Sequence, residues 1–212
     1  MANVNMPKGF SPVGSLTGAN WNQQGRLYAI ANDASNTYAI GDVVKTAGNC
    51  DADGIPLVTK WLGTNGATDI PLGIIVGIRV ADPTVSLVGT NLDLTKTWIP
   101  LSAGITRYVY VVDDPHIIFT AQFDVTGVTA AQVHRNCGAT VVQDQTSSLA
   151  VSSPFSSIVL TGPATTNTLP IRLLGLLQTP TSIGQFGAYA NVLAKFNNHE
   201  FGVGTGTNFQ GV

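Results

Sequence analysis

Three stretches decide the fold class of this chain: Ile-Ile-Val-Gly-Ile at residues 74–78, Tyr-Val-Tyr-Val-Val at 108–112 and Leu-Leu-Gly-Leu-Leu at 173–177. The runs are short, and the first two are dominated by β-branched and aromatic residues, which is typical of β-strands. Each run is continuously apolar, and such strands are buried on both faces. A neighbouring subunit or a second layer must therefore cover the additional face, and oligomerisation is the more economical explanation.

The rest of the chain shows the same pattern of short apolar runs. Glu200 is the only glutamate, and 23 glycines with 11 prolines interrupt nearly every run, so evidence for helices is scarce. The sequence predicts strands at Leu27–Ile30, Asp42–Thr46, Leu57–Trp61, Gly73–Val80, Tyr108–Val112, Ile117–Phe123, Ala139–Gln143, Ser157–Leu160, Ile171–Gln178 and Asn191–Phe196. We expect one short helix at Thr129–Arg135, capped by Thr129. No tandem repeat at a fixed period is apparent. The pattern predicts an all-β fold, either a jelly roll or a β-barrel or sandwich.

The two ends of the chain differ from the middle. Prolines and glycines in residues 1–26 oppose regular structure, yet the segment also carries large apolar residues that a disordered tail seldom has. We expect an extended N-terminal arm at 1–26, an all-β domain at 27–201 and a flexible, glycine-rich C-terminal tail at 202–212. The expected contacts with a partner are Phe10, Val13, Leu16, Trp21 and, in the tail, Phe209.

Charge excludes several classes of partner. Only 10% of the residues are charged, against about 25% in an ordinary soluble domain, and the formal net charge is −2. No cluster of Lys and Arg is present to neutralise phosphates, so nucleic acid is disfavoured as a partner. No basic leader with an apolar core and no stretch long enough to span a bilayer is apparent, so we expect no secretory signal and no membrane partner. A sparsely charged surface favours contact with other proteins or with copies of the chain itself.

Motifs that could carry chemistry are weak. Asp113-Asp114-Pro115 ends an apolar strand and predicts a turn, because neighbouring strand residues point to opposite faces and rarely share a proton. Asp51-Ala52-Asp53-Gly54 lacks the glutamate of a calcium loop and also predicts a turn. Gly202–Gly206 is followed by no helix that could bind phosphate. The sequence therefore predicts no catalytic residue, no metal site and no cofactor.

The scattered histidines and cysteines support the same conclusion. His116, His134 and His199 have no Ser or Cys context of a nucleophilic site. Cys50 and Cys137 form no metal-binding spacing. Two reduced thiols fit assembly in a reducing cytoplasm, although sequence alone leaves a disulfide between them open.

Four segments together resemble a known family. They are Met6–Ser15 (Met-Pro-Lys-Gly-Phe-Ser-Pro-Val-Gly-Ser); Gly41–Lys45 with Leu72–Gly77; Arg107–Gln122; and Ile171–Leu177 with Val192–Gly206. The chain resembles a family of small structural proteins of tailed bacteriophages, the head decoration or capsid cement proteins. The match is weakest at Asp82–Leu101 and Asp144–Thr168, which we expect to be variable surface loops.

The resemblance implies an all-β protein on the outer surface of the capsid, assembled in the host cytoplasm and bound to the major capsid protein as an oligomer. Of the possible oligomers, a trimer is favoured over a dimer because it fits local threefold positions of a shell. One alternative is a receptor- or carbohydrate-binding head of a fibre or spike, supported by Thr- and Asn-rich loops and dispersed aromatic residues. Another, much less favoured, is a glycan hydrolase that uses Asp113 and Asp114.

Overall fold

The protein is all-β. The computed structural model describes residues 3–30, 36–63, 69–79, 97–99, 106–141, 156–179 and 182–202. Its strands are β1 (Ser11–Ser15), β2 (Arg26–Ile30), β3 (Tyr38–Ala39), β4 (Val43–Cys50), β5 (Pro56–Lys60), β6 (Gly73–Ile78), β7 (Trp98–Ile99), β8 (Arg107–Val112), β9 (Ile117–Gln122), β10 (Asn136–Val141), β11 (Ile158–Ala164), β12 (Ile171–Leu176), β13 (Gln178–Thr179), β14 (Ser182–Ile183) and β15 (Asn191–Phe196).

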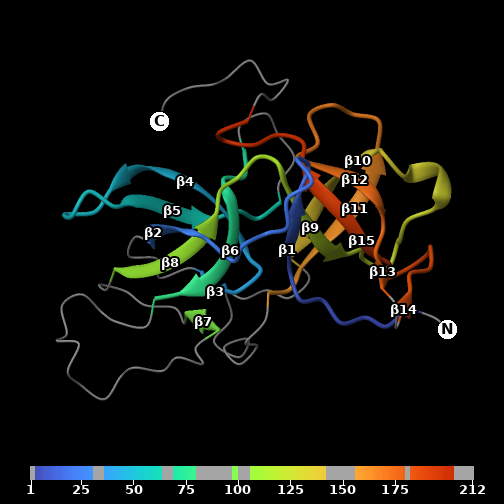
Figure 1. Ribbon diagram of the computed structural model, residues 1–212, viewed down its shortest axis with the longest axis horizontal. Coiled ribbons are helices and arrows are strands. Elements are labelled where there is room, and N and C mark those ends of the chain that lie inside the picture. Colours follow the sequence, from blue (N-terminus) through green and yellow to red (C-terminus); the bar gives the residue numbers. More distant parts are fainter. Residues whose placement is uncertain are drawn as a thin grey trace.

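These strands form two lobes that lie side by side (Figure 1). In one lobe β2, β5, β4, β6 and β8 close into a barrel, which decides between the barrel and the jelly roll. In the other lobe a six-stranded sheet has the order β1-β9-β15-β12-β10-β11. The short pairs β3 with β7 and β13 with β14 complete the fold.

The two lobes repeat one topology. Each lobe contains five strands, which we number one to five in the order in which they occur along the chain. Across the sheet they lie in the order one, five, four, two, three. This order is β2-β8-β6-β4-β5 in the first repeat and β9-β15-β12-β10-β11 in the second. In both, the third strand returns parallel to the first, at Ile30 beside Val58 and at Phe123 beside Leu160. The remaining pairs within each repeat are antiparallel. The repeat is therefore one of strand order and pairing, and it has no counterpart as a fixed period in the sequence.

Matched irregularities align the two repeats residue by residue. The fourth strand slips against the fifth between Ile75 and Gly77 in the first repeat, and between Leu173 and Gly175 in the second. Such slips are β-bulges, which insert one extra residue into a strand and increase its local twist. The bulge precedes a glycine in both, so Gly77 and Gly175 occupy equivalent positions.

The alignment continues into the first strand of each repeat. Tyr110 lies opposite the first of these glycines and pairs on its other side with Leu27. Leu193 lies opposite the second glycine and pairs with Thr120. Leu27 of β2 and Thr120 of β9 are therefore equivalent. The residues that follow are equivalent too, as far as Ile30 and Phe123, where the parallel contacts lie.

The junction between the lobes explains the continuously apolar strands. Neighbouring residues of β6 face opposite ways: Ile75 points into the first barrel, while Ile74 joins the core shared with the second lobe. Val111 and Val112 of β8 divide in the same way. In β6 and β8 both faces are thus largely buried within one chain, so these two runs no longer argue for oligomerisation. In the run 173–177 only Leu173 is fully buried.

The element predictions are mostly confirmed. Every strand predicted from the sequence coincides with a strand, although most ends differ by one to four residues. The predicted helix is only a 3-10 turn at Ala130–Gln132, where the Gln132 side chain accepts a hydrogen bond from the Thr129 N–H at 2.8 Å. Of the two predicted variable loops, residues 82–96, 100–101 and 144–155 lie outside the described residues. The described part of the second, 156–168, contains β11, whose first residues are buried, so the prediction of a surface loop is wrong there.

Candidate interaction surface

The N-terminal segment is attached to the chain's own second lobe. Gln122, at the end of β9, accepts a hydrogen bond from the Met6 N–H at 3.0 Å and donates one to the Val4 carbonyl at 2.9 Å. The Asn3 side chain donates to the carbonyls of Gln185 and Ala188, each at 3.0 Å. The prediction of an arm separate from the domain is therefore wrong: these residues and β1 belong to the second lobe.

A close crossing directs this segment into the lobe. The Phe10 N–H donates to the Gly41 carbonyl at 2.9 Å. Gly9 has a φ of 70°, and a Cβ built there would lie 2.4 Å from the Cβ of Ser156. A glycine is required at this crossing, because any side chain would collide with the chain beneath it.

The structure buries Phe10, which the sequence proposed as a partner contact. Its side chain is 1% exposed and stacks on Phe119 in the core. Phe10 is therefore not available to another protein, and this prediction is wrong.

The other predicted contacts have different outcomes. Val13 is 44% exposed and Leu16 is 48% exposed. Trp21 is partly buried and packs against the shared core. Phe209 lies outside the described residues. Val13 and Leu16 therefore remain as surface candidates.

The edge of β1 favours contact through side chains rather than through the backbone. Pro12 has no N–H to donate, and the register slips between Pro12 and Gly14. On the outer side, the Ser15 N–H donates to the Ala19 carbonyl at 2.9 Å. Short, bulged edges that contain proline resist pairing with further strands. Val13, placed at the bulge, projects its side chain instead.

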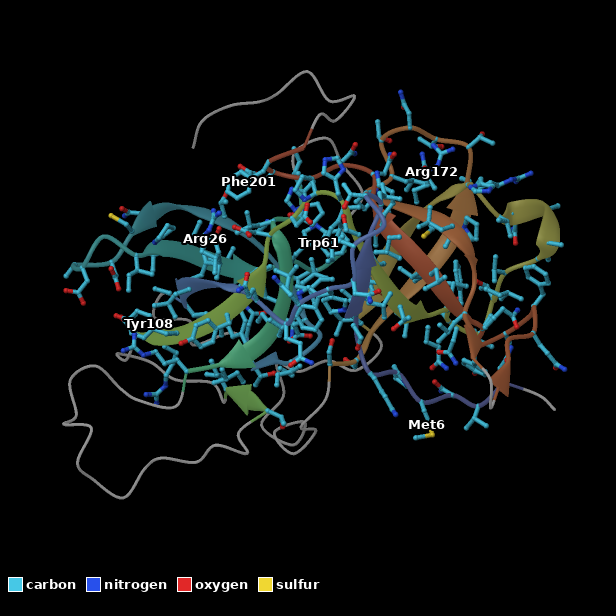
Figure 2. All side chains as sticks on the ribbon, viewed as in Figure 1. Met6, Arg26, Trp61, Tyr108, Arg172 and Phe201 are labelled. Carbon is cyan, nitrogen blue, oxygen red and sulfur yellow. The ribbon has the colours of Figure 1, made fainter. Side chains whose placement is uncertain are left out.

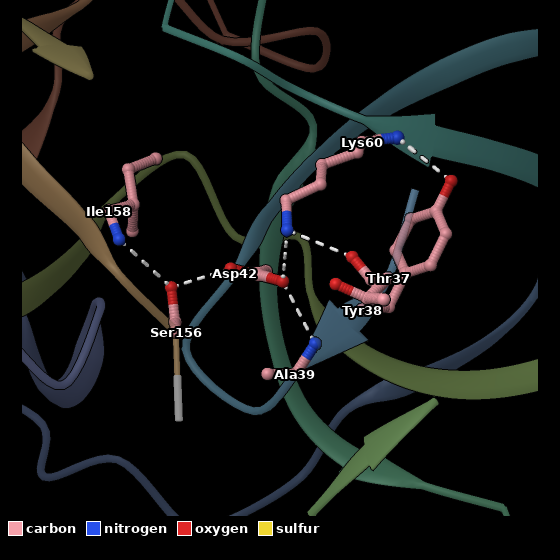
Figure 3. A network of polar contacts seen from close by, with 7 residues as sticks. All are labelled: Thr37, Tyr38, Ala39, Asp42, Lys60, Ser156 and Ile158. Carbon is pink, nitrogen blue, oxygen red and sulfur yellow. Dashed lines mark hydrogen bonds and ion pairs between the residues drawn. The ribbon is translucent and has the colours of Figure 1, made fainter. Parts of the chain in front are cut away.

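A buried ion pair in the first barrel is linked by a hydrogen bond to the second lobe (Figure 3). The ammonium of Lys60 lies 2.9 Å from the carboxylate of Asp42, with side chains 3% and 1% exposed. Ser156, which precedes β11, donates to the other Asp42 oxygen at 2.5 Å. One carboxylate thus connects the first barrel to the second lobe.

Further hydrogen bonds satisfy this buried pair. The Ala39 N–H donates to Asp42 at 2.8 Å, and Lys60 donates to the Thr37 carbonyl at 2.9 Å. Buried charges persist when they are paired and hydrogen-bonded in this way. The sequence feature that could have indicated this pair is Lys60 within the apolar run 57–61, since a charge in a buried strand needs a partner.

One end of the first barrel carries an exposed aromatic and cationic pair. Arg26 contacts Asp113 at 3.0 Å, and its side chain is 64% exposed. Its guanidinium lies 5.9 Å from the centre of the Phe201 ring, which is itself 54% exposed (Figure 2). The Tyr28 hydroxyl donates to Asp113 at 2.7 Å, and burial together with this carboxylate raises the pKa of Tyr28.

The equivalent end of the second repeat is apolar. Phe119 corresponds to Arg26, and Phe196 corresponds to Asp113, so a ring contact at 4.9 Å replaces the ion pair. Phe10 covers Phe119 much as Phe201 covers Arg26. The difference is exposure: the second repeat seals this end, while the first leaves it open to solvent. Nothing in the sequence singles out Arg26 or Phe201, because the contrast is visible only when the two repeats are paired.

His199 lies between these two ends. Its ring is 5.5 Å from that of Phe196 and 6.1 Å from that of Phe201, and its Nδ1 accepts a hydrogen bond from the Phe201 N–H at 3.0 Å. Burial lowers the pKa of His199 to about 4, more strongly than the nearby Asp113 carboxylate raises it. This histidine is therefore neutral at pH 7 and acts as a packed ring.

The acidic motifs form turns, as predicted. Asp114 accepts a hydrogen bond from the His116 N–H at 2.8 Å, while Asp113 faces Arg26. Asp51 accepts from the N–H groups of Asp53 and Ile55 at 3.0 and 2.8 Å. The two carboxylates proposed for hydrolysis thus serve separate structural contacts.

The side chains that could bind a metal ion or form a disulfide are dispersed over the described structure. Within the described ranges no group of three or more His, Cys, Asp or Glu side chains gathers to hold a metal ion. Cys50 is exposed and Cys137 is buried, and both are free thiols, which answers the question of a disulfide. In that same part of the chain, no helix has the length and apolar character needed to cross a membrane.

Comparison with known proteins identifies no relative: no family model, no curated protein and no solved structure matches the chain.

Proposed function

We propose that this chain is a structural decoration protein of a tailed-phage head, which binds the outer surface of the shell and links neighbouring copies of the major capsid protein. The four segments that resemble the cement family support this proposal, as does the all-β fold. The observation that carries it is the edge of the second lobe at β1, where Val13 on the strand and Leu16 directly after it expose apolar side chains on a segment that the chain itself holds in place.

Rigid attachment of this edge matters for binding. The surrounding contacts of Gln122 and Phe10 fix β1 before any partner arrives, so little conformational entropy is lost on docking. Many copies on one shell would then multiply a modest affinity for each site. A clamp of this kind raises the barrier to rupture under the outward pressure of a packaged genome.

The test compares surface variants on heads that lack the protein. Val13→Asp and Leu16→Asp alter exposed side chains, so both variants should fold, but their occupancy of the heads should fall by about tenfold or more. Val125→Asp is the matched control, because Val125 is 66% exposed and lies in the turn after β9. If the Val13 and Leu16 variants saturate heads as the parent protein does, the proposal fails.

Oligomerisation remains part of the proposal, with a trimer favoured over a dimer. Mass photometry of the free protein and of protein released from heads measures this directly. A gel of purified virions should show a band near 22.1 kDa at a ratio close to that of the major head protein.

A second candidate function is recognition of a carbohydrate receptor by a fibre or spike. The exposed ring of Phe201, flanked by Arg26, supports it, since sugars stack on aromatic faces and bond to charged groups. Selective signals on a glycan array, lost in Phe201→Ala, together with labelling of the tail rather than the head, would favour this alternative.

A further inference from the structure

The second repeat receives a strand that the first repeat lacks. β1 pairs antiparallel with the start of β9, from Ser11 opposite Thr120 to Ser15 opposite Ile117. The alignment makes Leu27 of β2 equivalent to Thr120. Among the described strands, however, β2 pairs only with β8 on one side and, at Ala29 and Ile30, with β5 on the other. The side of β2 that precedes Ala29 is the position that β1 fills in the other repeat.

The chain connectivity explains why this side stays open. β1 precedes the first repeat in sequence but pairs with the second, so it crosses between the repeats. The corresponding leader of the second repeat is only the turn Asp113–His116 between β8 and β9. Four extended residues span about 13 Å, and this turn is further closed by the hydrogen bond from the His116 N–H to Asp114. It cannot return a strand to β2.

The surface beside this position has the chemistry of a binding site. Gln24 is exposed, Gly25 and Leu27 are partly exposed, and Arg26 and Phe201 project next to them. A Cβ at Gly25 would lie 3.1 Å from the Val76 Cγ2 and 3.2 Å from the Tyr110 Cβ, so the glycine lets this part of the chain pack closely on its own barrel. Arginine and aromatic residues are the types that dominate binding energy at protein interfaces. A strand added here would gain main-chain hydrogen bonds from β2 and side-chain contacts from this pair.

We propose that the free side at Gly25, Arg26 and Leu27, where β2 begins, accepts an extended segment of the shell protein, which adds antiparallel to β2 in the place that β1 occupies on β9. This inference rests on the proposed function and names its second point of attachment. β1, with the sequence Ser-Pro-Val-Gly-Ser, provides the template: small and β-branched residues, with proline only where the incoming strand donates no N–H to β2. A second copy of this chain is a poor donor, because its β1 is already held in its own sheet by the buried ring of Phe10.

Hydrogen exchange of the full-length protein, free and bound to heads, tests the strand addition. Amides in residues 25–27 that do not bond to β8 should exchange at least tenfold more slowly in the bound protein. Amides in the equivalent residues 118–120 are the matched control, because β1 already lies beside them, and their exchange should not change. The control also reports that the second lobe stays folded.

Each other outcome overturns the inference, and the outcomes are distinguishable. Binding to heads without slower exchange at 25–27 overturns the strand addition alone. Equal protection of 25–27 and 118–120 in the free protein shows that another part of the chain occupies the site. Failure to bind heads at all removes the proposed function together with this inference.

A pair of phenylalanine variants gives a second measurement. Phe201→Ser should weaken binding to heads by about tenfold, because this ring lies at the proposed site. Phe186→Ser is the matched control, since Phe186 is 44% exposed but belongs to the second lobe, and it should bind as the parent does. Equal binding of the two variants contradicts the proposed site.

Discussion

The ring of Phe10 stacks on the ring of Phe119 with centroids 4.7 Å apart and planes at 10°. This contact makes the N-terminal segment part of the core. Phe10→Ala should lower the free energy of unfolding by about 3–5 kcal/mol, because it removes a fully buried aromatic side chain. Met6→Ala, which truncates a side chain that is 60% exposed, should change it little. Urea denaturation of both variants measures the difference, and equal stabilities would contradict the stacked arrangement.

The same contact predicts the effect of deleting residues 1–20. The deletion removes Phe10 and the whole of β1, so we expect loss of cooperative folding in the second lobe rather than a folded protein that merely fails to bind. Circular dichroism and thermal melting check this. A truncated protein that melts like the parent would show that the segment is a separate arm after all.

The buried pair Asp42–Lys60 gives a third prediction. Asp42→Asn should destabilise the protein by about 3–5 kcal/mol, because it leaves the Lys60 ammonium buried without a countercharge. Lys45→Ala is the control, since it breaks a partly exposed pair with Asp69 and should cost about 1 kcal/mol or less. Chemical denaturation of both variants tests the contrast, and similar losses would argue against burial of Asp42.

His199 predicts a dependence of stability on pH. Its pKa is about 4 in the folded protein and 6.5 in the unfolded chain, so between these values the unfolded chain binds more protons. Stability should therefore be complete above pH 6.5 and fall by about 3 kcal/mol as the pH drops to 4. His199→Phe keeps a ring between Phe196 and Phe201 and should remove most of this slope. If the slope is unchanged in the variant, other groups cause it.

The two thiols should differ in reactivity. Cys50 is exposed, whereas burial raises the pKa of the Cys137 thiol and removes it from reagents. Titration with a thiol-reactive chromophore should modify one cysteine in the native protein and both in denaturant. Cys50→Ser should abolish the native reaction, and rapid modification of that variant would contradict the burial of Cys137.

Local sequence was sufficient for the longer strands after residue 26 and for the turns, but not for β1 or the two-residue strands. Runs such as 74–78 and 108–112 are rich in β-branched and aromatic residues, and strand preference is a property of short segments. The turns at Asp51 and Asp114 also depend only on nearby groups, since each carboxylate accepts hydrogen bonds from N–H groups within four residues. These features could be read along the chain.

The candidate site could be predicted only in part. Val13 and Leu16 are exposed as expected, but Phe10, in the same segment, is buried. Their residue types do not separate these fates. What separates them is the crossing at Gly9 and Gly41, which turns Phe10 toward Phe119.

By itself, the sequence determined an all-β chain of short strands joined by tight turns, because period, propensity and turn chemistry act over a few residues. The tertiary structure alone decided that these strands form two equivalent repeats, that β1 crosses from one repeat to the other, and that Arg26 takes the place of Phe119. The physical reason is that pairing between distant strands depends on register and on the packing of both faces. Because the loops of the two repeats differ in length, equivalent strands do not recur at a fixed spacing along the chain, and the repeat cannot be detected from the sequence.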